Sequence, residues 1–320
     1  MIKYLLFPIT WLFNIIVFIR NTLYDYNILT SISSHIPIIS VGNIQVGGTG
    51  KTPFVIALSK QLIANNIKPL IITRGYRRNT TNQIVFNKLN EYGVKEVGDE
   101  PYYMKKVLKT VPIIIDHNKK NAVKTANQIT GIDCILLDDG FQSRYINKNI
   151  DIVLISKLSK NNNFTLLPVG RLREPVSNLK RAHFIYTTKG LNAFKGHNFK
   201  HLKFTFKIIK TKNDNNQINN IEPMIAFCGI ANSQYFISIL KNMNIKIDRK
   251  IKFDNHAKYD SKKYKQLKNA NPNNLSFITT YKDFVKLDES FKNKYIIYVL
   301  EMSLILNDNQ LIEKIKKLIK

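Results

Sequence analysis

The chain has 320 residues, which exceeds the size of one ordinary domain and predicts two. Its hydrophobic share of 44% excludes a disordered chain, and its two cysteines, Cys134 and Cys228, lie far apart in apolar runs, which excludes a disulfide framework and a zinc site. Lysine and arginine outnumber aspartate and glutamate by 49 to 22, a net charge of +27 that favours phosphates, nucleic acid or an anionic membrane as partners.

The first predicted element is an apolar helix within residues 1–25. Residues 4–19 carry no charge and are closed by Lys3 and Arg20. This run is shorter than the roughly 20 apolar residues that span a bilayer, and a proline and two polar residues interrupt it, so we expect an interfacial membrane anchor. No small-x-small cleavage site follows, so we expect the segment to stay in the mature protein. A buried N-terminal core helix is the alternative.

A phosphate-binding loop follows, between a predicted strand and a predicted helix. The apolar run 37–41 leads into Gln45-Val46-Gly47-Gly48-Thr49-Gly50-Lys51-Thr52, and residues 54–58 are apolar again. Glycines let backbone N–H groups close around an anion at the positive end of a helix. Lys51 would reach the β- and γ-phosphates of a nucleoside triphosphate, and Thr52 would hold Mg²⁺. The strict pattern has a glycine in place of Gln45, and an ordinary glycine-rich turn is the alternative.

After this loop, short β-rich runs alternate with helical stretches. The predicted strands are 70–73, 84–86, 113–115, 134–137 and 152–155, and the predicted helices between them are 99–109 and 118–129. Such alternation predicts a mostly parallel α/β sheet of the P-loop NTPase type, with helices on both faces. The ligand of such a sheet belongs at the carboxyl ends of the strands.

Two acidic clusters supply the carboxylates that phosphoryl transfer needs to hold Mg²⁺ and to accept a proton. Asp138 and Asp139 end the strand 134–137, and Asp99 and Glu100 open a predicted helix. Taken alone, the first pair is explained by a turn and the second by a helix cap. Beside a phosphate-binding loop, the two clusters indicate a metal-binding and catalytic site.

A polar run at residues 211–222 is the best candidate for a hinge between domains. It would separate a P-loop core, residues 26–210, from a smaller α/β domain, residues 223–320. Predicted strands of the smaller domain are 224–227, 275–278 and 295–299. The chain ends in a predicted amphipathic helix with apolar positions at 311, 312, 315, 318 and 319.

These motifs together resemble one known family, the tetraacyldisaccharide 4′-kinases, which are the lipid A 4′-kinases of Gram-negative bacteria. The matching stretches are 41–44, 46–53, 73–76, 97–101, 137–142, 167–175 and 228–232. The likeness runs from residue 1 to about residue 300 and is specific in combination. Two positions depart from the family pattern: Asn255 stands before His256 where the family usually has Asp, and Tyr281 stands before Lys282 where it usually has Glu.

The resemblance implies transfer of the γ-phosphoryl group of ATP, with Mg²⁺, to the 4′-hydroxyl of a tetraacylated disaccharide 1-phosphate. This lipid lies at the cytoplasmic face of the inner membrane, where the enzyme would be peripheral or N-terminally anchored, with no obligate protein partner evident. Asp99 is expected to be the general base, oriented by His256, and Lys51 the third catalytic group. The expected Mg²⁺ ligands are Thr52, Glu100, Asp138 and Asp139. The groups expected to grip the lipid phosphate or the nucleotide are Arg74, Arg77, Arg78, Arg171, Arg173 and Gln142.

Two other classes of protein remain open on the residues alone. A membrane-associated P-loop GTPase or ATPase carries a similar loop, but the nearest guanine-reading candidate, residues 147–150, lacks the required Asp. A basic nucleic-acid-binding module would explain the charge, but no aromatic and basic RNA signature accompanies it, so we expect no specific nucleic-acid partner. We expect only the kinase to phosphorylate a lipid acceptor with ATP, so this activity distinguishes it from both other classes.

Overall fold

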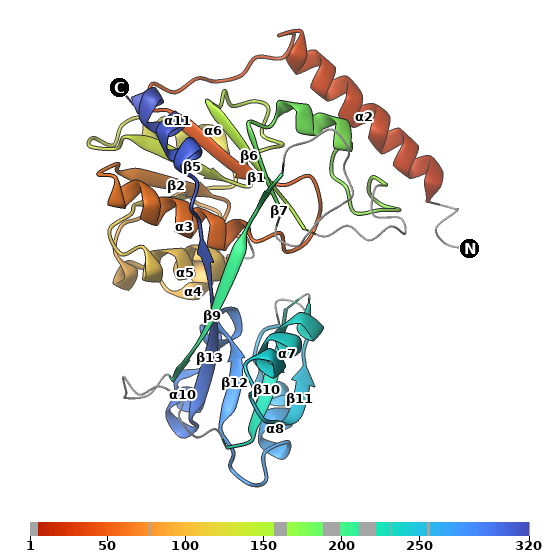
Figure 1. Cartoon of the computed structure of the whole chain (residues 1–320), viewed down its shortest axis with the longest axis vertical. Coiled ribbons are helices and arrows are strands. Elements are labelled where there is room, and N and C mark those ends of the chain that lie inside the picture. Colours follow the sequence, from red (N-terminus) through yellow and green to blue (C-terminus); the bar gives the residue numbers. More distant parts are fainter. Residues whose placement is uncertain are drawn as a thin grey trace. The chain divides into compact units, whose positions relative to one another are not determined.

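The structure is a computed structural model that describes residues 6–76, 78–156, 165–187, 199–210, 222–230, 232–254 and 257–319. It divides into two compact units (Figure 1). The larger unit comprises Met1–Lys203 and Leu304–Lys320, and the smaller unit comprises Phe204–Ser303. This differs from the predicted division, because the C-terminal helix belongs to the larger unit. The predicted hinge at 211–222 lies outside the described residues except for Glu222.

The larger unit is built on an eight-stranded sheet with the order β3-β4-β2-β5-β1-β6-β7-β8. Every neighbouring pair is parallel except β3 with β4, which confirms the predicted mostly parallel α/β sheet. The strands are β1 (Ile38–Gly42), β2 (Pro69–Thr73), β3 (Ile84–Phe86), β4 (Ile113–Ile115), β5 (Cys134–Asp138), β6 (Ile150–Ile155), β7 (Phe184–Thr187) and β8 (Lys200–His201). Every residue of β1, β2 and β5 is buried, as expected for central strands covered on both faces.

Helices cover both faces of this sheet, and Figure 1 shows the strands between α3 and α6. The helices of the larger unit are α2 (Phe7–Asp25), α3 (Lys51–Ala64), α4 (Val94–Val97), α5 (Asp99–Val107), α6 (Lys119–Ala126) and α11 (Asn309–Ile319), with short 3-10 turns at Leu89–Glu91 and Val176–Arg181. Helix α6 begins where the Asn118 side chain accepts hydrogen bonds from the backbone N–H groups of Lys120 and Asn121. The predicted helices 99–109 and 118–129 correspond to α5 and α6, each slightly shorter than predicted.

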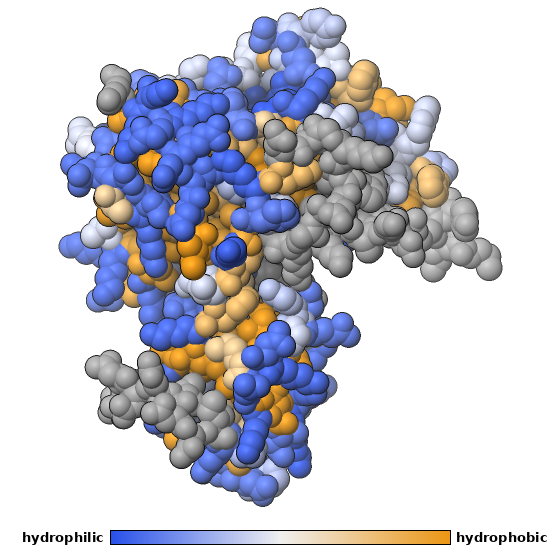
Figure 2. Space-filling model, in the orientation of Figure 1, coloured by the Kyte–Doolittle hydropathy of each residue, from blue (hydrophilic) through white to orange (hydrophobic). Residues whose placement is uncertain are grey.

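Helix α2 packs on the larger unit with one face and leaves the other exposed. Thr10, Val17 and Asn21 are buried. The apolar side chains with an exposed fraction of 50% or more are Phe7, Ile9, Trp11, Leu12, Ile16, Phe18 and Ile19. Figure 2 shows apolar side chains on the part of α2 that faces the viewer, and also in the middle of the view and in the smaller unit. Among the residues that the structure describes, no helix is long and apolar enough to cross a membrane.

The smaller unit has a five-stranded sheet with the order β11-β10-β12-β13-β9. Its elements are β9 (Lys203–Lys210), β10 (Met224–Cys228), α7 (Ser233–Asn242), β11 (Ile247–Lys252), α8 (Ser261–Asn269), β12 (Phe277–Thr280), α9 (Tyr281–Phe284), α10 (Glu289–Lys294) and β13 (Ile297–Ile305). An aromatic cluster that includes Phe227, Phe277 and Phe291 fills its core. The strands predicted at 275–278 and 295–299 each begin two residues later in the structure.

Candidate functional site

The phosphate-binding loop joins the carboxyl end of β1 to the first turn of α3. Gly47 has a φ of 107° and Gly50, the N-cap of α3, has a φ of 82°. Both angles lie in the left-handed region, which glycine adopts without steric cost. Lys51 and Thr52 are the first two residues of the 14-residue helix. The loop therefore places its backbone at the positive end of a helix, where anions bind.

Side chains from three segments brace this loop. Asn43 Nδ2 donates to Thr49 Oγ1 at 2.9 Å. Gln142 Nε2 donates to the carbonyl oxygen of Asn43 at 2.8 Å. Gln45, which stands where the strict pattern has glycine, donates through Nε2 to Ser156 Oγ. Gln45 and Gln142 are thus bound to the protein itself, and both brace the start of the loop.

Arg171 binds the backbone of the loop directly. Its Nη2 donates to the carbonyl oxygen of Val46 at 2.9 Å, and the backbone N–H of Val46 donates to the carbonyl oxygen of Arg171 at 2.8 Å. A Cβ atom at Gly47 would lie 2.3 Å from Arg171 Nη2. The missing side chain at this position therefore makes room for the guanidinium group.

Lys51 and Arg173 both contact the carboxylate of Asp139. Lys51 Nζ lies 3.3 Å from Asp139 Oδ1, and Arg173 Nη1 donates to Oδ1 and Oδ2 at 3.1 and 3.0 Å. Burial disfavours the ionised carboxylate, but the charges of Lys51, Arg173 and Lys119 outweigh it and hold the pKa of Asp139 well below its usual value. Asp139 is therefore ionised at neutral pH.

Asp138 ends β5 and is only 5% exposed. Its Oδ2 accepts a hydrogen bond from Thr73 Oγ1, on the neighbouring strand β2, at 2.9 Å. Its Oδ1 is buried and has no hydrogen-bond partner among the described residues. Burial, and after it the charge of Glu100, raises the pKa of Asp138 to about 6. Such a carboxylate oxygen is suited to a bound cation.

Two buried lysines hold the backbone of the acidic turn, and neither was predicted. Lys119 Nζ donates to the carbonyl oxygens of Asp138 and Asp139, both at 2.6 Å. Burial lowers the pKa of Lys119 to about 8, although the two aspartates oppose this shift. Lys148 Nζ lies 3.2 Å from Asp151 Oδ2 and also donates to carbonyl oxygens just after the turn. No sequence pattern distinguishes these lysines from the many exposed ones.

Asp99 and Glu100 open helix α5, directly after Gly98, whose φ is 91°. Asp99 is 9% exposed, and Glu100 is half-buried and close enough to raise the pKa of Asp138. The second acidic cluster therefore lies at the same edge of the sheet as the first, as the topology predicts.

The arginines after β2 occupy different environments. Arg74 is exposed, and its charge acts on Lys119, which places it near the acidic turn. Arg78 is buried, and its two terminal nitrogens donate to the carbonyl oxygens of Ile115 and Thr81, both at 3.2 Å. Burial lowers the pKa of Arg78. Arg74 has the exposure that a ligand-binding arginine needs, whereas Arg78 binds the protein backbone.

Two predicted site residues, Arg77 and His256, lie outside the described residues. In the smaller unit, Asp283 connects the stretch 228–232, which resembles the family, to the start of α9, where Tyr281 departs from the family pattern. Its Oδ2 accepts hydrogen bonds from the backbone N–H of Gly229 at 2.9 Å and from Thr280 Oγ1 at 2.8 Å. Asp283 is fully buried, so this contact fixes the start of α9 against the end of β10.

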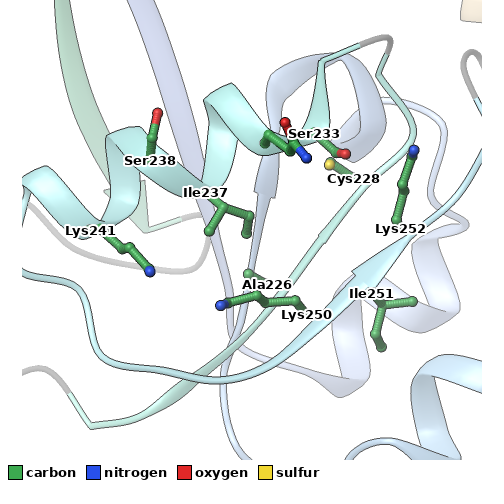
Figure 3. Close-up of a pocket in the computed structure, with 10 residues that line it drawn as sticks. Ala226, Cys228, Ser233, Ile237, Ser238, Lys241, Lys250, Ile251 and Lys252 are labelled. Carbon is green, nitrogen blue, oxygen red and sulfur yellow. The ribbon is translucent and has the colours of Figure 1, made fainter.

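The smaller unit also contains a cavity of ≈ 390 Å³ between α7 and the strands β10 and β11 (Figure 3). Its lining includes three lysines, Lys241, Lys250 and Lys252, and two serines, Ser233 and Ser238. None of the predicted site residues that the structure describes lines it.

Comparisons with known proteins agree with this arrangement. The family model described as Tetraacyldisaccharide-1-P 4′-kinase matches residues 2–320. The Tetraacyldisaccharide 4′-kinase of Aquifex aeolicus is 31% identical over 331 residues, which cover 100% of this chain and 98% of that protein. The protein of the same name from Flavobacterium psychrophilum is 32% identical over 330 residues, which cover 97% and 94% of the two chains.

A solved structure extends the likeness to three dimensions. The crystal structure of LpxK from Aquifex aeolicus in complex with ATP matches with a TM-score of 0.83 at 28% sequence identity. The match covers 100% of this chain and 99% of the other. By sequence over its whole length and by fold, the chain belongs to the tetraacyldisaccharide-1-P 4′-kinase family.

Proposed function

We propose that this protein transfers the γ-phosphoryl group of ATP to the 4′-hydroxyl of a tetraacyldisaccharide 1-phosphate, with the loop 45–52 as the triphosphate site. The observation that carries the proposal is the joint contact of Lys51 and Arg173 with Asp139, next to a glycine-rich loop that opens α3. Two cations and a helix N-terminus at one place suit the charge of a transferring phosphoryl group. Membership of the family and the likeness to an ATP complex support the same reaction.

In the proposed step, the 4′-oxygen attacks the γ-phosphorus while the bond from that phosphorus to the β–γ bridging oxygen breaks. ADP leaves with the bond's electron pair, and the hydroxyl proton passes to Asp99. Lys51 and Arg173 neutralise the charge that develops on the phosphoryl oxygens. Both cations already lie together on Asp139, so they need only exchange one anionic partner for another when the triphosphate binds.

The residues at this site also fit Mg²⁺. When bound, the ion neutralises the β- and γ-phosphates and orients them. Thr52 and one or two of the carboxylates of Glu100, Asp138 and Asp139 are the proposed ligands, and the buried Oδ1 of Asp138, which has no hydrogen-bond partner among the described residues, supports them. No group of three or more His, Cys, Asp or Glu side chains in the described ranges is placed to hold a metal. This is compatible with Mg²⁺, which usually takes one or two carboxylates, with phosphate and water completing its shell.

Asp99 is the proposed general base, because it lies at the same edge of the sheet as the loop and is largely buried. An aspartate is a weak base at neutral pH, so we expect a second ionisable group to assist it. His256 is our candidate for this positioning role. Arg74 and Arg171 are the proposed ligands of the lipid phosphate or the nucleotide, because guanidinium groups bind phosphate through paired hydrogen bonds.

We further propose that the enzyme works at the cytoplasmic face of the inner membrane, with the exposed apolar face of α2 in the lipid interface. Seven apolar side chains exposed by 50% or more on one helix form a surface that water solvates poorly. The net charge of +27 favours the anionic leaflet. The acyl chains of the acceptor would reach the site from that surface.

The proposed reaction is tested by incubating the protein with γ-labelled ATP, Mg²⁺ and the disaccharide lipid in detergent, followed by chromatography of the lipid. We expect the label on the lipid with the wild-type protein and none with Lys51→Ala. Label released only as inorganic phosphate, or an equal preference for GTP, would favour the targeting-type NTPase instead.

A further inference from the structure

Residues 165–174, here called the positioning segment, contact both helix α2 and the phosphate-binding loop. The segment closes on itself: the backbone N–H of Leu167 donates to the carbonyl oxygen of Leu172 at 2.9 Å, and that of Leu172 donates to the carbonyl oxygen of Thr165 at 3.1 Å. A Cβ atom at Gly170 would lie 1.9 Å from the Thr165 oxygen, so only glycine permits this closure. The segment is therefore a tight turn closed by its own backbone hydrogen bonds.

One side of the positioning segment binds the inner polar face of α2. Thr10 Oγ1 accepts a hydrogen bond from the backbone N–H of Val169 at 3.3 Å. Arg20 Nη2 lies 3.2 Å from Glu174 Oε1, and Asn21 Nδ2 donates to Glu174 Oε2 at 3.4 Å. Glu174 is fully buried. A buried carboxylate is tolerated only when its partners are held in place, so these contacts fix the position of α2.

Other atoms of the same segment bind the catalytic groups. Arg171 exchanges two hydrogen bonds with Val46, one from its side chain and one through its carbonyl oxygen. The backbone N–H of Arg173 donates to the carbonyl oxygen of Ile44 at 2.7 Å, and its side chain binds Asp139. Helix α2 therefore fixes the positioning segment, and this segment in turn fixes the start of the phosphate-binding loop and the Asp139 carboxylate.

A second connection runs from Glu174 to the acidic turn. Arg181 Nη2 donates to Glu174 Oε2, and its guanidinium carbon lies 4.5 Å from the ring centroid of Phe141. Phe141 is fully buried and follows Asp139 by two residues. Stacking of a guanidinium on an aromatic face fixes both groups. Glu174 thus contacts α2 on one side and, through one residue, the acidic turn on the other.

We propose that the inner polar face of α2, formed by the buried Thr10 and Asn21 and the half-buried Arg20, is a positioning element for phosphoryl transfer. By fixing the positioning segment, it holds Val46 and Asp139 where the triphosphate needs them. Helix α2 thereby has two separate faces with two roles, an outer apolar face and an inner polar face that sets the geometry of the site. This inference rests on the proposed assignment of the loop 45–52 to ATP.

The sharpest variant is Thr10→Val, which removes the hydroxyl that accepts from Val169 and keeps the shape of the side chain and the whole outer face of α2. Two quantities are measured: the hydrogen exchange rate of the Val46 amide in the protein without ligands, and kcat with ATP and detergent-dispersed lipid. We expect the exchange rate to rise several-fold and kcat to fall roughly 10-fold with little change in KM for the lipid, because a small misplacement of catalytic groups mainly affects kcat.

Ser34→Ala is the matched control, because Ser34 Oγ also accepts a backbone hydrogen bond, from Ile36 at 3.0 Å, but before the amino end of β1. It should leave both quantities at the wild-type value. Asn21→Ala is a second test variant, and it should act in the same direction as Thr10→Val. Unfolding temperatures of all variants, recorded in parallel, identify a variant that is partly unfolded at the assay temperature.

A double-variant cycle separates positioning from general destabilisation. The Arg173→Lys variant already has an altered contact with Asp139. In this variant, Thr10→Val should lower kcat by a much smaller factor than in the wild-type protein, because the two changes act through one segment. If Thr10→Val lowers kcat by the same factor in the wild-type protein and in the Arg173→Lys variant, the proposal is overturned. So would Thr10→Val and Asn21→Ala proteins that keep both the wild-type exchange rate at Val46 and the wild-type kcat. If the wild-type protein transfers no phosphate to the lipid, the proposed function fails, while the exchange rate at Val46 still decides whether α2 holds the loop.

Discussion

At the residue scale, the site is organised around the carboxylate of Asp139. The residue has a φ of 52°, a backbone angle that Asp adopts more readily than most residues. Lys119 binds its carbonyl oxygen from within the core, while Lys51 and Arg173 bind its side chain. Backbone and carboxylate are thus fixed independently, so that the two cations converge on one point.

The role of Lys51 predicts a sharp contrast between two lysines on the same helix. Lys51→Ala should nearly abolish phosphoryl transfer, because it removes the charge that neutralises the phosphates, and Thr52→Ala should do so by removing the proposed Mg²⁺ ligand. Lys60→Ala removes the same charge from an exposed position of α3 and should leave kcat unchanged. Steady-state kinetics of the three variants makes the comparison. Substantial activity in Lys51→Ala would contradict the assignment of the loop.

The role of Asp99 predicts a loss of rate without a loss of nucleotide affinity. Asp99→Ala should lower kcat by about 10²-fold or more, because a general base contributes to the chemical step and not to the binding of ATP. His256→Ala should have a smaller effect, and the double variant should be no slower than Asp99→Ala alone if the two act as one unit. Kinetics together with calorimetric titration of ATP gives both quantities. A defect confined to ATP binding would move Asp99 to the metal site.

The residues that could be predicted from the sequence were those in motifs whose chemistry is local. Lys51 and Thr52 follow glycines, and Asp138 ends an apolar run, so the neighbouring residues in the sequence indicate the proposed role of each. Lys119 and Lys148 could not be predicted, because they act on carbonyl oxygens that only the folded chain brings to them. Glu174 lies within a stretch that resembles the family, yet its burial depends on α2, which is more than 150 residues away along the chain.

At the scale of elements, the C-terminal helix α11 joins the larger unit through a specific contact. Asp308, just before the helix, accepts hydrogen bonds from Lys200 Nζ at 2.6 Å and from the hydroxyl group of Tyr186. Leu311, Ile312 and Ile315 are buried. Periodicity predicted the helix and its apolar face, but a pattern of apolar positions does not specify which sheet they pack on.

Asp308 makes the stability of the larger unit depend on pH. Burial opposes ionisation, but the hydrogen bonds from Lys200 and Tyr186 outweigh it and lower the pKa of Asp308. A carboxyl whose pKa is lower in the folded state stabilises the fold above its unfolded pKa of about 4, and this contribution is lost as the pH falls through the folded value. Asp308→Asn should therefore lower the free energy of unfolding by about 1–3 kcal/mol at pH 7, and by less below pH ~4.

Urea denaturation at several pH values measures this difference. Glu313→Gln is the control on the same helix, because its contact with Lys316 is exposed and exposed ion pairs contribute little. It should change the free energy of unfolding by less than about 0.5 kcal/mol. A loss in Asp308→Asn that is as large at pH 3 as at pH 7 would show that the charge of Asp308 is not what stabilises the helix.

The outer face of α2 predicts binding to membranes that does not depend on charge. Trp11→Ser and Phe18→Ser remove two side chains that are each 68% exposed and should reduce flotation with anionic liposomes at a salt concentration that screens the basic surface. Ile296→Ser removes an apolar side chain that is 44% exposed outside α2, and it should float like the wild-type protein. Unchanged flotation of the two α2 variants would show that the outer face of α2 does not contribute to membrane binding.

At the scale of the whole molecule, the sequence sufficed to predict six strands of the larger sheet and their mostly parallel arrangement, but not β7 and β8. Fully buried runs such as 134–137 alternate with helices, and this order permits few topologies. The division into units could not be predicted in full, because the chain returns from the smaller unit to the larger one at Leu304. The sequence carries no polar linker at this second boundary, because strand β13 continues across it.

Transfer of phosphate to one hydroxyl group of the lipid is the central proposed property of this protein. The most direct test supplies the purified protein with ATP, Mg²⁺ and either the tetraacyldisaccharide 1-phosphate or the same lipid lacking its 4′-hydroxyl, and identifies the product by mass spectrometry and ³¹P NMR. We predict one added phosphate, as a monoester at the 4′ position, with the first lipid and none with the second. Equal phosphorylation of both lipids, or consumption of ATP without any phosphorylated lipid, would contradict the account.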